Sequence, residues 1–328
     1  MKNRILLINT GGTIGMIGEP LQPSKDWKEI TKNHPILWDF PVDYYQMENL
    51  VDSSDMNPDI WLEIAKILKK EYENYDGFVI LHGTDTMSYT ASALSFLCKN
   101  LSKPIILTGS QVPLAKPRSD ALQNLITAIQ IASQYKIPEV CILFRDNLLR
   151  GNRSKKIDAT NYFGFSSPNY PVLGEIGAEI KISWDKILSF PKEKFQVEEN
   201  LCSDIIVLEI FPGMNIEFYN TILNSSIKGI ILKTFGNGNA PTSLCFLEFL
   251  KELQKKKIPV INVTQCIRGS VEHGKYAASH NLISLGVISS KDMTTEASIT
   301  KLMYLLGKNY SYEEIQEAFQ KNLAGEIS

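Results

Sequence analysis

Two threonine hydroxyls stand in similar settings, each directly after a glycine where a short apolar run ends. They are Thr13, which follows Gly12, and Thr84, which follows Gly83. A threonine hydroxyl is a weak nucleophile unless a neighbouring group takes its proton. The second threonine also has a carboxylate beside it, Asp85. The pattern indicates nucleophilic chemistry on threonine, although either glycine-threonine pair alone also fits a plain strand-to-loop turn.

A base for such a hydroxyl could come from histidine or lysine. His82 precedes the second threonine tip, but we expect it to be a buried histidine that satisfies the end of a strand. Lys155 and Lys156 form a pair in a later polar segment. Burial and a neighbouring cation can lower a lysine pKa from its usual value of about 10.4. Lysine pairs are also typical of solvated surfaces, so composition alone leaves both interpretations open.

The elements that must position these residues alternate regularly in the first half of the chain. Four apolar runs read as buried strands, and each ends in a polar tip: Ile5–Ile8, Gly77–Leu81, Pro104–Leu107 and Val140–Phe144. Helices are predicted between them, one capped by Asn57, one near 88–97, and one at 122–132 capped by residues 118–120. This alternation predicts a parallel sheet with helices on both faces. The polar tips then meet at the carboxyl edge of the sheet, where α/β proteins bind ligands.

The second half of the chain repeats the pattern after an interruption. Residues 160–200 predict a hairpin and a linker. Further strands are predicted at 204–210, 229–233, 259–263 and 282–288, with helices near 216–223, 242–255, 294–306 and 311–322. We therefore predict two domains, a larger N-terminal α/β domain at 1–195 and a smaller C-terminal α/β domain at 203–328.

Composition narrows the class of protein. With 328 residues, 44% hydrophobic residues and a formal net charge of −2, nothing steers the chain toward nucleic acid or a membrane. The first apolar run is too short for a signal-peptide core. Five scattered cysteines without a C-x-x-C motif predict free thiols and a cytoplasmic setting. Four dispersed histidines predict that no metal is bound.

The two threonine tips, read together, carry a resemblance. The stretches NTGGTIG (9–15) and HGTDTM (82–87) resemble the signature pair of the bacterial-type L-asparaginases, in order and in spacing. Further matches follow the type I, cytoplasmic branch of that family: DSSDM (52–56), TGSQVP (108–113), RGNR (150–153), TQC (264–266) and DMT (292–294). The resemblance spans nearly the whole chain and implies the two-domain asparaginase fold.

The resemblance implies hydrolysis of L-asparagine to L-aspartate and ammonia, with no cofactor. Thr13 would attack the side-chain amide carbon to give an acyl-enzyme. Thr84, Lys156 and Asp85 would form a relay for protons and water, with Lys156 preferred over Lys155 because the family pattern reads Arg-x-x-Lys from Arg153. Backbone N–H groups near both threonines would hold the oxyanion, usually a large electrostatic contribution.

The resemblance also implies how the substrate is held. Asp85 would pair with the α-ammonium group, and Ser53 and Ser54 with the α-carboxylate; the neighbouring Asp52 and Gly83 would complete this substrate site. Asn239 would come from the partner subunit of a homodimer or dimer of dimers. The alternatives are a simple loop for the two serines and an ordinary turn asparagine at 239.

One departure from the family pattern keeps rival functions open. Many bacterial members carry a mobile tyrosine in the loop after the nucleophile, whereas the expected lid from Met16 to Trp27 has Leu21 near that position. A non-catalytic amino-acid sensor is one rival. A second is an ammonia-generating amidotransferase subunit, although such subunits usually carry an extra N-terminal domain and the first strand here begins at residue 5. A regulatory asparagine site near Cys266 and the choice between asparagine and glutamine stay undecided.

Overall fold

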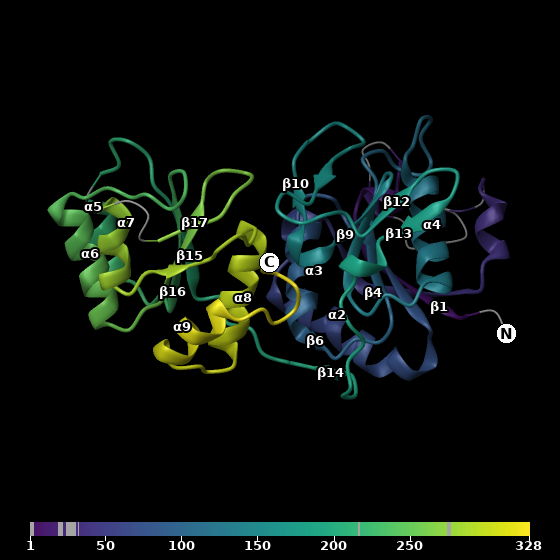
Figure 1. Cartoon of the computed structure of the whole chain (residues 1–328). Coiled ribbons are helices and arrows are strands. Elements are labelled where there is room, and N and C mark those ends of the chain that lie inside the picture. Colours follow the sequence, from purple (N-terminus) through teal and green to yellow (C-terminus); the bar gives the residue numbers. More distant parts are fainter. Residues whose placement is uncertain (1–2, 19–21, 24–30, 32, 216, 274–276) are drawn as a thin grey trace. The chain divides into compact units, whose positions relative to one another are not determined.

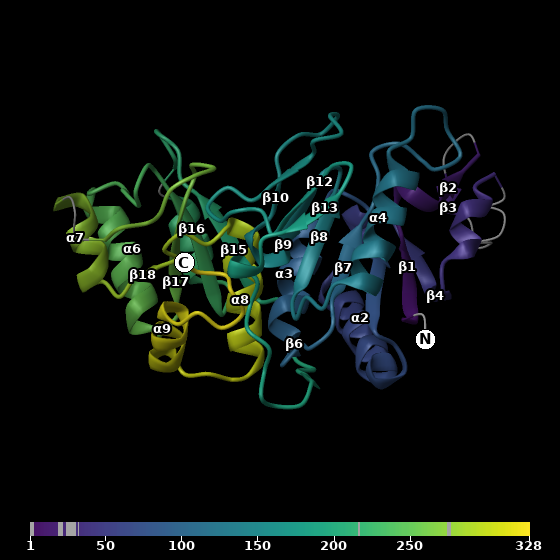
Figure 2. The ribbon, with the colours of Figure 1, turned by 45° about the vertical axis from the view of Figure 1, so that its right-hand side comes forward.

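The computed structural model describes residues 3–18, 22–23, 31, 33–215, 217–273 and 277–328. The chain forms two compact units, Met1–Glu199 and Asn200–Ser328, and each is described by itself. Figure 1 shows the ribbon coloured along the sequence, and Figure 2 shows the same ribbon turned by 45°.

The first unit is built on an eight-stranded sheet. Five strands run parallel: β4 (Val42–Val51), β1 (Ile5–Gly11), β5 (Gly77–Leu81), β7 (Ile105–Thr108) and β8 (Val140–Phe144), in that order across the sheet. Three antiparallel strands continue it: β9 (Asn147–Arg150), β12 (Gly174–Ile176) and β13 (Ile180–Ile182). The four predicted strands are confirmed, and the expected hairpin is β12–β13. The strands β4 and β9 were not predicted. The sheet is mixed rather than wholly parallel because β9, β12 and β13 join it in antiparallel pairing.

Helices cover both faces of this sheet, as predicted. The buried residues of α4 (Ala121–Gln134) form one hydrophobic cluster with alternate residues of the strands, such as Ile5, Leu7 and Val79. The helices α2 (Pro58–Glu71) and α3 (Met87–Leu97) contribute nothing to that cluster and lie against the opposite face (Figure 1). Side chains alternate along a strand, so both sets of strand residues are buried.

The two predicted helix caps differ in outcome. The Asn57 side chain accepts hydrogen bonds from the Asp59 and Ile60 amides at the start of α2, as predicted. At α4, Ser119 Oγ accepts from the Ala121 amide, but the Asp120 carboxylate does not cap the helix. It instead accepts from the amides of residues 111 and 112, because the chain turns back on itself there.

The second unit has a parallel four-stranded sheet: β15 (Ile205–Glu209), β16 (Gly229–Thr234), β17 (Val260–Thr264) and β18 (Ile288–Ser289). Its helices are α5 (Glu217–Leu223), α6 (Leu244–Lys255), α7 (Ala277–Ser284), α8 (Thr295–Gly307) and α9 (Tyr312–Gln320). The strand predicted at 282–288 is wrong over most of its length, since residues 282–284 belong to α7. A short apolar run does not distinguish a strand from a buried helical turn.

Shorter elements connect these parts. Two-residue strands pair as β2 (Met16–Ile17) with β3 (Gln22–Pro23), β6 (Cys98–Lys99) with β14 (Gln196–Val197), and β10 (Lys155–Lys156) with β11 (Phe165–Ser166). Short 3₁₀ helices occur at Thr13–Gly15, Pro35–Asp39, Ser53–Asp55, Tyr72–Asn74, Gly151–Arg153 and Trp184–Lys186.

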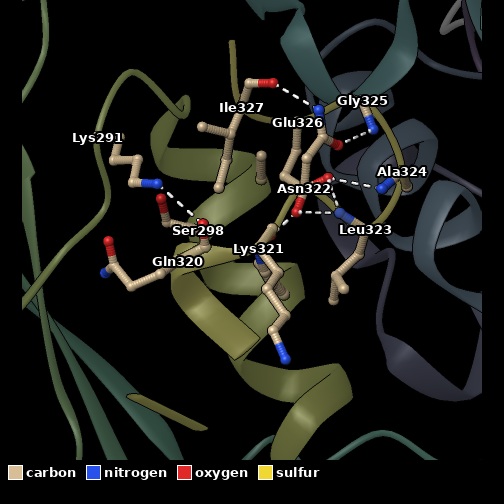
Figure 3. Close-up of polar contacts among 12 residues, drawn as sticks. Lys291, Ser298, Gln320, Lys321, Asn322, Leu323, Ala324, Gly325, Glu326 and Ile327 are labelled. Atoms are coloured by element: carbon tan, nitrogen blue, oxygen red, sulfur yellow. Dashed lines mark hydrogen bonds and ion pairs between the residues drawn. The ribbon is translucent and has the colours of Figure 1, made fainter. Parts of the chain in front are cut away.

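The second unit closes on a buried ion pair near its C-terminus. Lys301 Nζ on α8 lies 2.5 Å from Glu326 Oε1, and both side chains are fully buried. The Glu326 carboxylate also accepts the amides of Leu323 and Ala324. Figure 3 shows the turn that these bonds close, in which Asn322 bonds to the Gly325 amide and the Ile327 carbonyl. This turn satisfies charges that would otherwise be costly to bury.

Candidate active site

The two threonine tips lie side by side because their strands are neighbours. β1 and β5 pair in parallel register, with Asn9 opposite Leu81, so both chains leave the sheet at the same edge. Gly12 has φ of 84°, and a Cβ atom built on it would lie 2.3 Å from Gly83 N. Only glycine permits this backbone-to-backbone approach. The contact places the chain entering Thr13 directly against the chain entering the second tip.

A third tip, from the end of β4, packs against these two. The Ser53 side chain is buried, and a Cβ on Gly83 would lie 2.4 Å from its Oγ. Thr86 Oγ1 donates to the Ser53 carbonyl at 2.6 Å. The predicted substrate-binding residues Ser53 and Gly83 are therefore in contact at the carboxyl edge of the sheet.

Asp52 and Ser54 interact with each other in the same tip. Asp52 Oδ1 accepts from the Ser54 amide at 2.9 Å and from Ser54 Oγ at 2.7 Å. These two hydrogen bonds hold the pKa of Asp52 below its usual range. Both residues are exposed, so this carboxylate keeps its charge while it shapes the turn.

The predicted relay residues come together around one amine. Lys156 Nζ, on β10, lies 2.8 Å from Thr84 Oγ1 and 2.6 Å from Asp85 Oδ1. The lysine side chain is 18% exposed, whereas Asp85 is 65% exposed. The structure thus brings a hydroxyl, an amine and a carboxylate into one hydrogen-bonded row, with the carboxylate at the solvent end.

Gln111 joins this group and was not singled out from the sequence. Thr84 Oγ1 donates to Gln111 Oε1 at 3.4 Å, and Gln111 Nε2 donates to the Asn161 carbonyl at 3.0 Å. The Asp120 carboxylate accepts a hydrogen bond from the backbone N–H of Gln111 and so fixes the backbone of Gln111. The available signal was the position of this glutamine in the tip after the third predicted strand.

His82 is a buried structural histidine, as predicted. Its Nδ1 lies 2.7 Å from the Gly83 carbonyl and its Nε2 lies 2.8 Å from Thr90 Oγ1. Complete burial lowers the pKa of His82 to about 4, because the imidazolium form would lose its hydration. The ring is therefore neutral near physiological pH.

Two family models match this chain. "Asparaginase, N-terminal" matches residues 4–188, and "Glutaminase/Asparaginase C-terminal domain" matches residues 204–319. The chain belongs to the asparaginase family.

Individual relatives agree with this assignment. L-asparaginase 1 of Escherichia coli K12 is 42% identical over 340 aligned residues, which cover 100% of this chain and 98% of the relative. The crystal structure of L-asparaginase I from Vibrio cholerae matches with a TM-score of 0.94 and 42% identity, covering 100% of both chains. The thermostable L-asparaginase from Thermococcus kodakarensis matches with a TM-score of 0.91 and 31% identity, covering 99% of both chains. The resemblance to the type I branch and the two-domain asparaginase fold are confirmed.

Some positions of interest in this asparaginase-family chain belong to the second unit or fall outside the described residues. Asn239 belongs to the second unit, in a turn after β16 where its amide and carbonyl both bond to Phe235. Cys266 follows β17 in the same unit and is exposed. Leu21 and most of the expected lid from Met16 to Trp27 lie outside the described residues. None of the described side chains bonds to Thr13 Oγ.

Proposed function

We propose that this chain hydrolyses L-asparagine to L-aspartate and ammonia through a covalent intermediate on Thr13. The observation that carries the proposal is the contact of the Thr13 tip with a second tip bearing a hydroxyl–amine–carboxylate row. Thr13 Oγ attacks the side-chain amide carbon, the carbon–nitrogen bond breaks, and ammonia leaves with the proton of the hydroxyl. Water then hydrolyses the ester, which restores Thr13 and releases aspartate.

The relay suits the second half of this reaction. Lys156 lies between Thr84 and Asp85 and forms hydrogen bonds with both. In its neutral form the amine accepts a proton from the attacking water through the Thr84 hydroxyl, and this proton returns to Thr13 Oγ when the ester bond breaks. Backbone amides of the two glycine-threonine tips would donate to the developing oxyanion.

The substrate's charged groups find partners in the same region. The exposed Asp85 carboxylate is available to the α-ammonium group. Ser53 and Ser54 would bind the α-carboxylate, with Asp52 holding the turn and Gly83 giving close access to the backbone. A pocket of this kind distinguishes asparagine from glutamine by about 1–3 kcal/mol for one methylene.

Ammonia release from L-asparagine by the purified chain tests the proposal. Thr13→Ala should abolish release, and a matched Thr221→Ala variant, at an exposed position on α5, should not change it. Rapid quenching should trap an ester on the peptide that contains Thr13. An unchanged rate in Thr13→Ala would show that the nucleophile is assigned wrongly. Thermal stabilisation by asparagine without ammonia release would favour a sensor instead.

We further propose that the chain works in the cytoplasm as a homodimer or a dimer of dimers, with Asn239 completing the partner's site. The five cysteines are unpaired, which agrees with a reducing compartment. Mixing inactive Thr13→Ala chains with Asn239→Ala chains tests the assembly. Hybrid dimers should regain activity, since one of their two sites would contain both native residues. A mixture that stays as inactive as its components would contradict the shared site.

A further inference from the structure

A buried row of three side chains lies behind the Thr84 tip and ends on its backbone. Trp61 Nε1, on α2, donates to Thr90 Oγ1 at 2.9 Å. Thr90, on α3, lies 2.8 Å from His82 Nε2, and His82 Nδ1 lies 2.7 Å from the Gly83 carbonyl oxygen. All three side chains are buried. Two helices are thereby connected to the peptide that precedes Thr84.

The chemistry of the two end groups fixes the direction of every hydrogen bond in this row. An indole N–H can only donate and a carbonyl oxygen can only accept. His82 Nδ1 must therefore carry a proton, which it donates to the Gly83 carbonyl. Because the buried ring is neutral, Nε2 has no proton and accepts from Thr90, which itself accepts from Trp61. The low pKa of about 4 for His82 agrees with this single arrangement.

Anchoring the Gly83 carbonyl determines where the next amide points. A trans peptide is planar, and its C=O and N–H groups point in opposite directions. With the Gly83 oxygen held against the buried histidine, the Thr84 N–H is directed away from His82. Among the residues that the structure describes, none accepts a hydrogen bond from this amide. It is the amide that a developing oxyanion at this tip would need.

The surrounding backbone leaves this peptide little freedom. A Cβ on Gly109, at the end of β7, would lie 2.3 Å from the His82 carbonyl oxygen. A Cβ on Gly12 would lie 2.8 Å from the His82 carbonyl carbon. The backbone at 82–83 is thus enclosed by the tips of both neighbouring strands, and the His82 ring supplies the hydrogen bond that sets its orientation.

We propose that His82 is a positioning residue for the hydrolytic reaction. Through the fixed row from Trp61 and Thr90, it holds the Gly83–Thr84 peptide so that the Thr84 amide faces the reacting group. This inference rests on the proposed amide hydrolysis. It assigns His82 no proton transfer and no contact with substrate.

Two substitutions of His82 separate its two hydrogen bonds. His82→Asn places an amide N–H near the position of Nδ1 and keeps the bond to Gly83, whereas His82→Gln places its amide near Nε2 and loses that bond. We expect His82→Gln to lower kcat by roughly 10- to 100-fold, below the roughly 100- to 1,000-fold effect of removing an oxyanion donor. KM should change only a few-fold, and His82→Asn should recover most of kcat. Equal activity in the two variants would overturn the proposal.

Thr90 gives an independent test in case the His82 variants fold poorly. Thr90→Val keeps the shape of the side chain but leaves Nε2 without its donor, so the imidazole proton can move from Nδ1 to Nε2. We expect a lower kcat in Thr90→Val and near-normal kcat in Thr90→Ser. The control is Thr127→Val on α4, another buried threonine, which should lower the melting temperature without lowering kcat. If Thr90→Val keeps the wild-type kcat, the proposal is wrong.

The tautomer can be observed without any activity. In ¹⁵N-histidine-labelled protein, the His82 resonance, identified by its loss in His82→Asn, should show a protonated Nδ1 and an unprotonated Nε2. A protonated Nε2 would overturn the inference even if the enzyme is active. Wild-type protein that releases no ammonia would instead refute the proposed function, whatever the tautomer.

Discussion

Replacing Gly12 by alanine is expected to separate the two threonine tips by about 1 Å. The new Cβ would lie 2.3 Å from Gly83 N, whereas ordinary contact begins at 3.4 Å. The three nearest atoms are backbone atoms of residues 82 and 83, so no side chain can rotate away. A displacement of 1 Å in a catalytic arrangement can lower the rate roughly 10²-fold. We therefore expect kcat/KM for asparagine hydrolysis to fall about 100-fold.

The positive φ of Gly12 could itself destabilise the variant, so the control must share it. Gly213, before α5, has φ of 87° against 84° for Gly12, and a Cβ on Gly213 would meet nothing within 4 Å. Both alanine variants should lose stability from the positive φ, by about 1–3 kcal/mol, but only Gly12→Ala should lose activity. The assays are steady-state ammonia release and thermal unfolding by circular dichroism. A folded Gly12→Ala variant with wild-type kcat/KM, or an equal loss in Gly213→Ala, would refute the reasoning.

Three further outcomes are expected. Lys156→Met should lower kcat by roughly 10²- to 10⁴-fold, the range for a lost acid–base group, and an unchanged rate of ammonia release would remove Lys156 from the relay. Lys301→Met should lower the free energy of unfolding by about 3–5 kcal/mol in urea titrations, because Glu326 stays buried without its partner. The double variant with Glu326→Gln should recover part of this loss, and equal stability of single and double variants would contradict the explanation. The pKa of His82 is about 4 in the folded state and about 6.5 in the unfolded state, so between these values the unfolded chain binds a proton that the folded chain does not. The contribution of the neutral imidazole to folding stability is therefore complete above pH 6.5 and is lost as the pH falls toward 4. The stability of wild type relative to His82→Asn should fall by about 3 kcal/mol over that range, and a pH-independent difference would contradict a neutral buried imidazole.

Strands with continuous apolar sequence were predictable, and strands with alternating sequence were not. β1 and β5 are buried along their whole length, and the residues Ile5–Ile8 and Gly77–Leu81 form uninterrupted apolar runs. β4 lies at the edge of the sheet and is mostly half-exposed, and its sequence carries acidic and amide side chains. Its carboxyl end nevertheless supplies the tip with Ser53, so one side of the site came from an element that the apolar pattern did not reveal.

Hydrogen bonds between residues far apart in the sequence could not be predicted either. Trp61 lies on the buried face of α2, and its hydrogen bond to Thr90 spans 29 residues of sequence. Asp120 was predicted to cap its own helix, yet its carboxylate turns back to the backbone at Gln111. Such contacts depend on how the chain folds over itself, and local spacing carries no information about them.

The sequence by itself determined the chemistry that is available: two glycine-threonine tips, a neighbouring carboxylate and a lysine pair, each placed after a predicted strand. Local residue types set these features, because apolar runs form buried strands and glycines allow a sharp turn of the backbone where a strand ends. Only the tertiary structure decided that Lys156 Nζ contacts Thr84 and Asp85 across more than 70 residues of chain. The register of β1 on β5 likewise places the two threonine tips side by side, and the pairing of β10 with β11 holds the segment that carries Lys156. Strand pairing is a long-range choice that no local pattern contains.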